Sequence, residues 1–113
     1  MSGGISIKKV LWMAQAHQCF YCGRFYPKDK RSALTIDHLF PRHAGNGRAM
    51  NSVLACKPCN SEKGGREPTP KEIDLARRVW ALTIEILRQH HKVLPRDWSM
   101  ARLEAIRREA PDA

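Results

Sequence analysis

Hydrophobic residues recur at helical spacing at the two ends of the chain. Within residues 5–17 an apolar side chain returns every three or four positions, which predicts a short amphipathic helix. A Thr-Pro-Lys-Glu capping box at residues 69–72 begins a second helix that we expect to run to about residue 91. Apolar residues cover more than one face of that helix, so it is expected to be wedged between the first half and a last helix over residues 98–109.

The middle of the chain alternates short apolar runs with turn residues. Residues 34–39 and 52–55 are predicted strands, and the Pro, Gly and Asn residues of 40–50 predict a loop between them. Residues 56–64 read as a short helix with a proline in its first turn and a glycine at its end, followed by a linker over 65–68. We therefore expect an α+β fold, in which two strands and a helix are flanked by one N-terminal and two C-terminal helices.

The length of the chain indicates the number of domains, and its charge indicates the kind of partner. A chain of 113 residues is expected to form one domain over residues 1–113, with a core at 19–65 and a helical C-terminal extension at 69–110. Residues 1–66 carry 11 Lys and Arg against 3 Asp and Glu, whereas residues 67–113 carry 9 against 8. The net charge of +9 thus lies almost wholly in the first part, where a polyanion is expected to bind.

No feature of the sequence indicates a membrane or an export route. The chain has no run of 18 apolar residues, so no membrane span is expected. Gln15, His17 and Gln18 interrupt the only apolar stretch that resembles a signal peptide. We therefore expect the protein in the cytoplasm of the cell that makes it.

Four cysteines fall into two pairs with metal-ligand spacing. Cys19 and Cys22 form the first pair, Cys56 and Cys59 the second, and each pair is too tight for a normal internal disulfide. The alternatives, disulfides in a secreted protein or buried free thiols, are disfavoured because no export signal is present. The pattern predicts a structural Zn²⁺ site, and four thiolates leave that ion no open position for a substrate.

Polar residues lie between and just after the two cysteine pairs, in an order that is specific to one protein family. The sequence resembles the HNH endonuclease family, in its four-cysteine zinc-binding branch, from about residue 19 to residue 65. The residues that carry the resemblance are the first cysteine pair with Tyr21 and Gly23, then Asp37, His38, Pro41, Gly45 and Asn51, then the second cysteine pair with Asn60 and Lys63. Many members have histidine where this chain has Asn60, so it is an HNN variant.

The resemblance implies a treble-clef-like ββα-metal core and a DNA endonuclease that hydrolyses phosphodiester bonds. By position, His38 corresponds to the general base and Asn51 to the residue that holds the loop and orients the histidine. Asp37 and Asn60 correspond to the ligands of one catalytic cation. An oxygen-only ligand set favours Mg²⁺ or Mn²⁺ over zinc or nickel. If Asp37 and His38 lie on a strand, their side chains point to opposite faces unless the strand ends or bends there.

Each of these residues also has a purely structural interpretation. An Asp-His pair beside a strand is often a hydrogen-bonded surface pair, and Asn60 could be an ordinary polar residue of a helix. Lys63 could reach a phosphate or be a solvated lysine, and a surface role is favoured for His43. Three tryptophans recur in the three long predicted helices and are expected to anchor the core rather than stack on bases: Trp12, Trp80 and Trp98.

Basic residues supply dispersed contacts for a double-stranded DNA backbone. None lies in a recognisable base-reading helix, so weak sequence preference and strong salt dependence are expected. The candidates are Lys8, Lys9, Arg24, Lys28, Lys30, Arg31, Arg42, Arg48, Lys57 and Arg66, with Lys63 as a further one.

Two other functions remain open at this stage. The first is a zinc-held DNA-binding module that does not cut. The second is an accessory nuclease that acts with a partner, as in phage packaging or restriction, in the cytoplasm of a bacterial or phage-infected host cell. The C-terminal helices could supply a homodimer contact or a docking surface for a protein partner, although packing within the chain is the simpler explanation.

Overall fold

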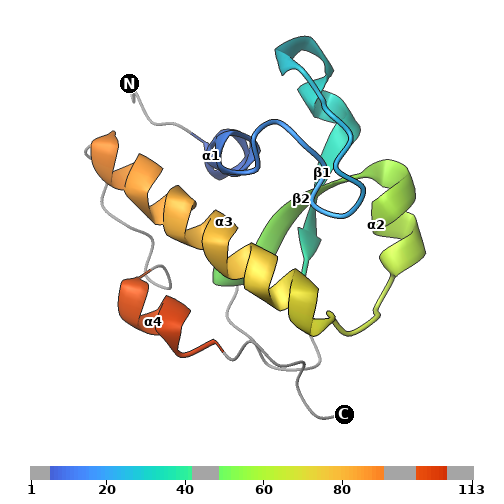
Figure 1. Cartoon of the computed structure of the whole chain (residues 1–113). Coiled ribbons are helices and arrows are strands. Elements are labelled where there is room, and N and C mark those ends of the chain that lie inside the picture. The colour runs from blue at the N-terminus through green and yellow to red at the C-terminus, as the bar shows by residue number, and fades with distance from the viewer. Residues whose placement is uncertain (1–5, 42–48, 91–98, 107–113) are drawn as a thin grey trace.

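The computed structural model describes residues 6–41, 49–90 and 99–106, apart from the side chain of Arg102. Its centre is an antiparallel hairpin of β1 (Leu34–His38) and β2 (Ser52–Cys56), in a register that runs from Leu34 opposite Cys56 to His38 opposite Ser52. The chain passes directly from β2 into α2 (Lys57–Lys63), which lies against both strands (Figure 1). This is the expected α+β fold with a small ββα core.

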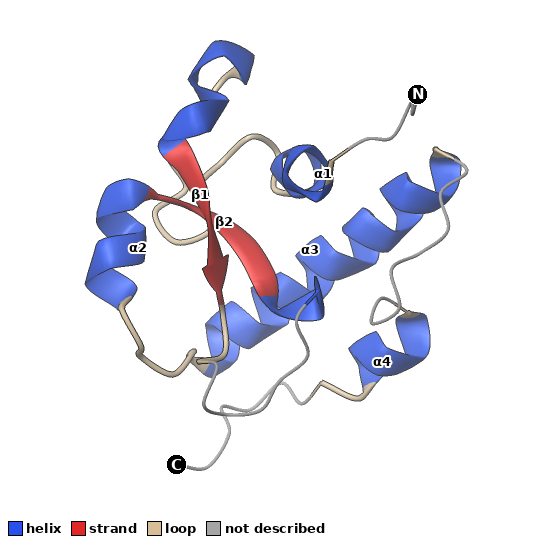
Figure 2. Cartoon of the chain, turned by 180° about the vertical axis from the view of Figure 1, so that it is seen from behind, coloured by secondary structure: helices blue, strands red, loops and turns tan. Residues whose placement is uncertain are grey.

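Three further α-helices lie within the described residues. α1 (Ile7–Ala14) packs on α3 (Pro70–Gln89), and α4 (Met100–Glu104) packs on α3 as well. Figure 2 shows, from behind, that α2 lies on one side of the hairpin and that α1 and α3 lie on the other. α3 is therefore wedged between the first half of the chain and α4, as the sequence predicts.

Local sequence signals explain where the helices begin. The side chain of Thr69 accepts from the Glu72 backbone N–H at 3.1 Å and the Glu72 carboxylate accepts from the Thr69 N–H at 3.0 Å, which completes the predicted capping box of α3. Pro58 lies in the first turn of α2, and Gly64 ends that helix with a φ of 52°. This left-handed backbone, easy for glycine, turns the chain from α2 toward the linker.

Two local elements differ from the expectation. The first helix ends at Ala14 rather than at residue 17, because Ala16 and His17 adopt φ values of 55° and 66°. The His17 ring then stacks on Trp12 at a centroid distance of 3.8 Å, which explains the turn. Lys28–Ala33, for which the sequence predicts no helix or strand, forms a 3-10 helix.

The core lies between the hairpin, α1 and α3. Trp80 is fully buried and donates its indole N–H to the Ser52 carbonyl at 2.9 Å, while Trp12 donates to the Tyr26 carbonyl at 2.8 Å. The predicted role of these two tryptophans as core anchors is confirmed, and Trp98 lies outside the described residues. The buried amide of Gln15 bonds to the backbone N–H and C=O of Leu54, which satisfies the outer edge of β2.

Within the described residues, no helix has the length and apolar composition needed to cross a membrane.

Candidate functional site

The four cysteines converge where the first cysteine pair meets the junction of β2 and α2. Their sulfur atoms all lie within 4.8 Å of one another, and Cys22 Sγ lies 3.9 Å from Cys56 Sγ. A tetrahedral ion with Zn–S bonds of about 2.3 Å requires sulfur separations of about 3.8 Å. A disulfide needs about 2.05 Å instead. The cluster therefore fits a metal such as zinc, and the cysteines are not paired as disulfides.

The electrostatics of the thiols also call for a cation. Burial opposes ionisation of Cys56, but hydrogen bonds led by the Cys59 backbone N–H lower its pKa to about 7. Burial, and then the neighbouring thiols, raise the pKa of Cys59. The Cys56 thiolate therefore forms more readily than the Cys59 thiolate. A bound divalent cation favours the thiolate form of its cysteine ligands.

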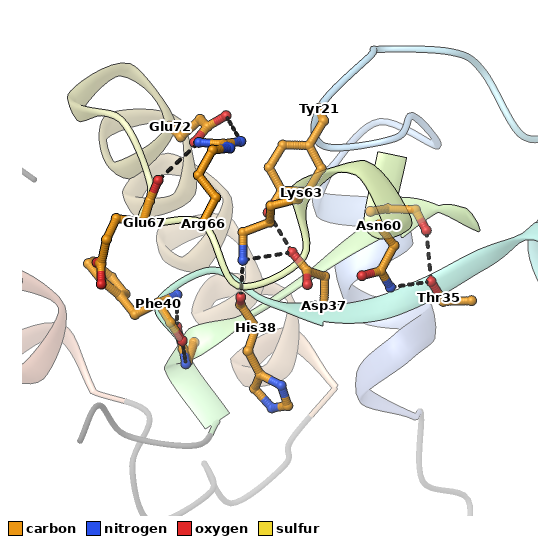
Figure 3. A network of polar contacts seen from close by, with 12 residues as sticks. Tyr21, Thr35, Asp37, His38, Phe40, Asn60, Lys63, Arg66, Glu67 and Glu72 are labelled. Carbon is orange, nitrogen blue, oxygen red and sulfur yellow. Dashed lines mark hydrogen bonds and ion pairs between the residues drawn. The ribbon is translucent and has the colours of Figure 1, made fainter. Parts of the chain in front are cut away.

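Asp37 lies at the centre of a buried polar cluster on the face of β1 that meets α2. Its Oδ2 accepts a hydrogen bond of 2.5 Å from the Tyr21 hydroxyl and lies 3.4 Å from Lys63 Nζ. Lys63 Nζ also donates to the His38 carbonyl at 2.5 Å, and its side chain is only 3% exposed (Figure 3). Burial and the Asp37 hydrogen bond raise the pKa of Tyr21, so the phenol stays a protonated donor. A buried lysine and a half-buried tyrosine thus hold one carboxylate oxygen.

His38 is the last residue of β1, and its ring is partly exposed. β1 stays regular up to this point, since His38 is still paired with Ser52. Figure 3 shows the imidazole pointing away from Asp37 and Lys63, as strand alternation requires. The strand therefore ends at His38 without bending before it, and the two side chains lie on opposite faces of the hairpin.

Asn51 holds the chain immediately after His38. Its side-chain oxygen accepts from the Phe40 N–H at 2.7 Å, and its side-chain nitrogen donates to the Phe40 carbonyl at 2.8 Å. The Leu39 N–H also donates to the Asn51 carbonyl at 2.8 Å. These bonds fix the backbone at the end of β1, and the predicted role of Asn51 in holding the loop stays a prediction. The proposed orientation of the His38 ring by Asn51 stays a prediction.

Asn60 projects from α2 toward β1 and meets Thr35. Its Nδ2 donates to Thr35 Oγ1 at 2.8 Å, and the Thr35 hydroxyl donates its single proton to the Ala55 carbonyl at 3.1 Å. Thr35 can therefore only accept from Asn60, which places the amide nitrogen on the Thr35 side. In Figure 3 the amide oxygen consequently faces the side of Asp37. A carboxylate oxygen of Asp37 and the amide oxygen of Asn60 can thus coordinate a hard cation.

The predicted phosphate contacts have varied surroundings. Arg24 and Lys57 are exposed, whereas Arg42, Arg48 and His43 lie outside the described residues. Lys63, also predicted to contact phosphate, is instead buried with its ammonium on Asp37 and the His38 carbonyl. Its contact with a phosphate stays a prediction.

Arg66, a further candidate for contact with a phosphate, is exposed but already paired with a carboxylate. Its guanidinium meets the carboxylate of Glu72 through two hydrogen bonds of 3.0 and 3.1 Å. This pair joins the linker to the first turn of α3. Contact between Arg66 and a phosphate would have to compete with Glu72.

Sequence reasoning assigned no role to two residues of the site. In the sequence, Tyr21 belongs to the residues that carry the family resemblance and Thr35 to a predicted strand, and neither position indicates a contact with a cation ligand. Thr35 lies two positions before Asp37, and strand alternation places the two on the same face. That spacing was the available signal for Thr35. No local pattern predicts the contact between Tyr21 and Asp37, which joins residues 16 positions apart.

Comparison with known families finds a match over part of the chain. Residues 19–71 match the family model described as HNH endonuclease, from the first cysteine to the second residue of α3. No curated protein matches the chain. The matched segment contains both cysteine pairs and the four polar residues to which the resemblance assigns roles in the reaction: Asp37, His38, Asn51 and Asn60.

Proposed function

We propose that the chain is a metal-dependent DNA endonuclease that hydrolyses phosphodiester bonds, because residues 19–71 match the HNH endonuclease family. Asp37 and Asn60 hold one divalent cation, and His38 is the general base. The observation that carries the proposal is the arrangement at the end of β1. There the amide oxygen of Asn60 faces the side of Asp37, while the His38 ring points to the other side.

The divergence of Asp37 and His38 suits this reaction. Hydrolysis of a phosphodiester proceeds by in-line displacement, in which the attacking water and the leaving oxygen lie on opposite sides of the phosphorus. A general base on one side of the phosphorus can act on the attacking water, and a cation on the other side can stabilise the leaving oxygen. The His38 imidazole removes a proton from the water, the general-base role that histidine most often takes in enzymes.

The ligand set selects the cation. Asp37 and Asn60 offer a carboxylate and an amide oxygen, and Mg²⁺ and Mn²⁺ prefer oxygen ligands. A bound cation neutralises charge on the phosphate and on the leaving oxygen. Tyr21 and Lys63 already satisfy one oxygen of Asp37, so we assign the cation to the other one.

Cleavage is expected to require Mg²⁺ or Mn²⁺. The purified full chain with its zinc retained should nick or linearise supercoiled plasmid when Mg²⁺ is added, and not when the buffer contains only Zn²⁺ or Ni²⁺. Asp37→Asn should lower the rate about 100-fold, since it removes the charge of one ligand but keeps its shape. Gel analysis of plasmid topology against time gives the rates.

Asp37→Asn is preferred to Asp37→Ala for this test, because asparagine keeps a side-chain oxygen that can accept from Tyr21 and face the buried Lys63 ammonium, whereas alanine removes that acceptor. Activity with Zn²⁺ or Ni²⁺ alone would contradict the oxygen-only ligand set. A parent protein that binds plasmid but cuts it with none of these metals would favour the alternatives, a non-catalytic DNA-binding module or a nuclease that needs a partner.

DNA binding is expected to weaken steeply with salt. If four exposed basic residues neutralise phosphates, the logarithm of the affinity should fall with a slope of about −3.6 against the logarithm of salt concentration. This corresponds to a loss of about 100-fold between 50 and 200 mM salt. Fluorescence anisotropy with a labelled duplex measures it.

The exposed Lys57 offers the matched test of this interpretation. Lys57→Gln should reduce the slope by about 1 if that ammonium meets a phosphate. Lys71→Gln, on the exposed start of α3, serves as the control and should leave the slope as it is. A flat response of the parent to salt would show that these residues do not neutralise the backbone.

A further inference from the structure

Two hydroxyl groups touch the side chains that we propose as cation ligands. Tyr21 donates to Oδ2 of Asp37 at 2.5 Å, and Thr35 Oγ1 accepts from Nδ2 of Asn60 at 2.8 Å. In each case the hydroxyl binds one atom of the terminal group, and the opposite oxygen, Oδ1 of Asp37 or Oδ1 of Asn60, takes no part in that bond. Each hydroxyl can thus fix which way an oxygen points.

Both hydroxyls are themselves held in place. Tyr21 lies between Cys19 and Cys22, and its ring meets Phe20 edge-on at a centroid distance of 5.0 Å. The Thr35 hydroxyl is anchored to the Ala55 carbonyl of β2 at 3.1 Å. The cysteine centre and the hairpin therefore determine the positions of the two groups, which removes freedom from the ligands before a cation arrives.

We infer that Tyr21 and Thr35 are positioning residues of the cation site. Tyr21 holds Oδ2 of Asp37 so that Oδ1 is presented to the cation, and Thr35 turns the amide of Asn60 so that its oxygen, not its nitrogen, is presented. This inference rests on the proposed function, because it takes Asp37 and Asn60 as the ligands. Neither hydroxyl touches the cation or the substrate.

The test is the affinity for Mn²⁺ alone, measured without DNA by electron paramagnetic resonance of free Mn²⁺ on the full, zinc-loaded chain. Tyr21→Phe and Thr35→Val should each weaken Mn²⁺ binding about 10-fold, because partners of metal ligands typically contribute that much to affinity. Thr35→Ser keeps the hydroxyl and should restore most of the affinity. Raising the Mn²⁺ concentration should restore the cleavage rate of both weakened variants, since the base is untouched.

Thr83→Val is the matched control. Thr83 is a fully buried threonine whose hydroxyl donates to the Val79 carbonyl at 2.7 Å within α3, away from the site. It should bind Mn²⁺ as the parent does, and zinc content and thermal unfolding should be followed for every variant.

If Tyr21→Phe and Thr35→Val bind Mn²⁺ as tightly as the parent while Asp37→Asn binds it more weakly, the positioning roles are wrong and the cation site stands. If Asp37→Asn also binds as tightly as the parent, the proposed cation site is itself wrong, and the inference is overturned with it. Loss of Mn²⁺ affinity in Thr35→Ser equal to that in Thr35→Val would overturn the role of the Thr35 hydroxyl.

Discussion

His38→Ala is expected to lower the rate of plasmid cleavage about 1,000-fold while leaving DNA affinity nearly unchanged. A positioned general base typically contributes a factor between about 100 and 10,000. The ring is partly exposed at the end of β1, so its loss should change the free energy of unfolding by only about 0.5 kcal/mol. The rates come from single-turnover cleavage of supercoiled plasmid in Mg²⁺, and the affinity from anisotropy with a duplex.

His90→Ala is the matched control, because His90 is an exposed histidine at the C-terminal end of α3. It should cut as fast as the parent. Cleavage by His38→Ala at the parental rate, with the same need for Mg²⁺, would remove His38 from the reaction. A cleavage rate that falls together with zinc content would instead indicate damage to the fold. The parent and the two variants are therefore compared at equal zinc content.

The parts of the fold predicted from sequence are those that local chemistry dictates. Two cysteine pairs, a capping box and a proline in a first turn each restrict the backbone within a few residues, so the hairpin, α2 and the start of α3 were predicted closely. The convergence of the cysteines also followed, because four metal-ligand thiols at this spacing have few other uses. The ends of α1 were predicted less well, since the stacking of His17 on Trp12 is a tertiary contact.

The candidate site was predicted in part. The assignment of roles to Asp37, His38 and Asn60 depended on the resemblance and not on periodicity. Sequence gave no hint that Lys63 is buried, because a lysine in the last turn of a short helix usually reaches solvent. Its partners explain the exception: Asp37 and the His38 carbonyl lie 26 and 25 residues earlier in the chain and satisfy the charge.

Removal of the metal from the four-cysteine centre is expected to unfold the core. Structural zinc contributes about 10 to 16 kcal/mol in small zinc-dependent folds, and the whole stability of a small domain is about 5 to 15 kcal/mol. A zinc-selective chelator should therefore abolish the cooperative thermal transition and expose Trp12, which bonds to the Tyr26 carbonyl beside the first cysteine pair. Circular dichroism and tryptophan fluorescence measure the two effects, and added Zn²⁺ should reverse them.

Cys56→Ser should reproduce the loss, because Cys56 is a buried cysteine that joins β2 to α2 and places its sulfur 3.9 Å from that of Cys22. Ser52→Ala provides the control and should keep its zinc, since Ser52 lies at the end of β2 opposite to Cys56. Chelation that strips the zinc but leaves the melting transition in place would mean that the α1–α3 core folds by itself. The cysteine centre would then organise only the candidate site, and the loss of Mn²⁺ affinity on chelation would measure that smaller role.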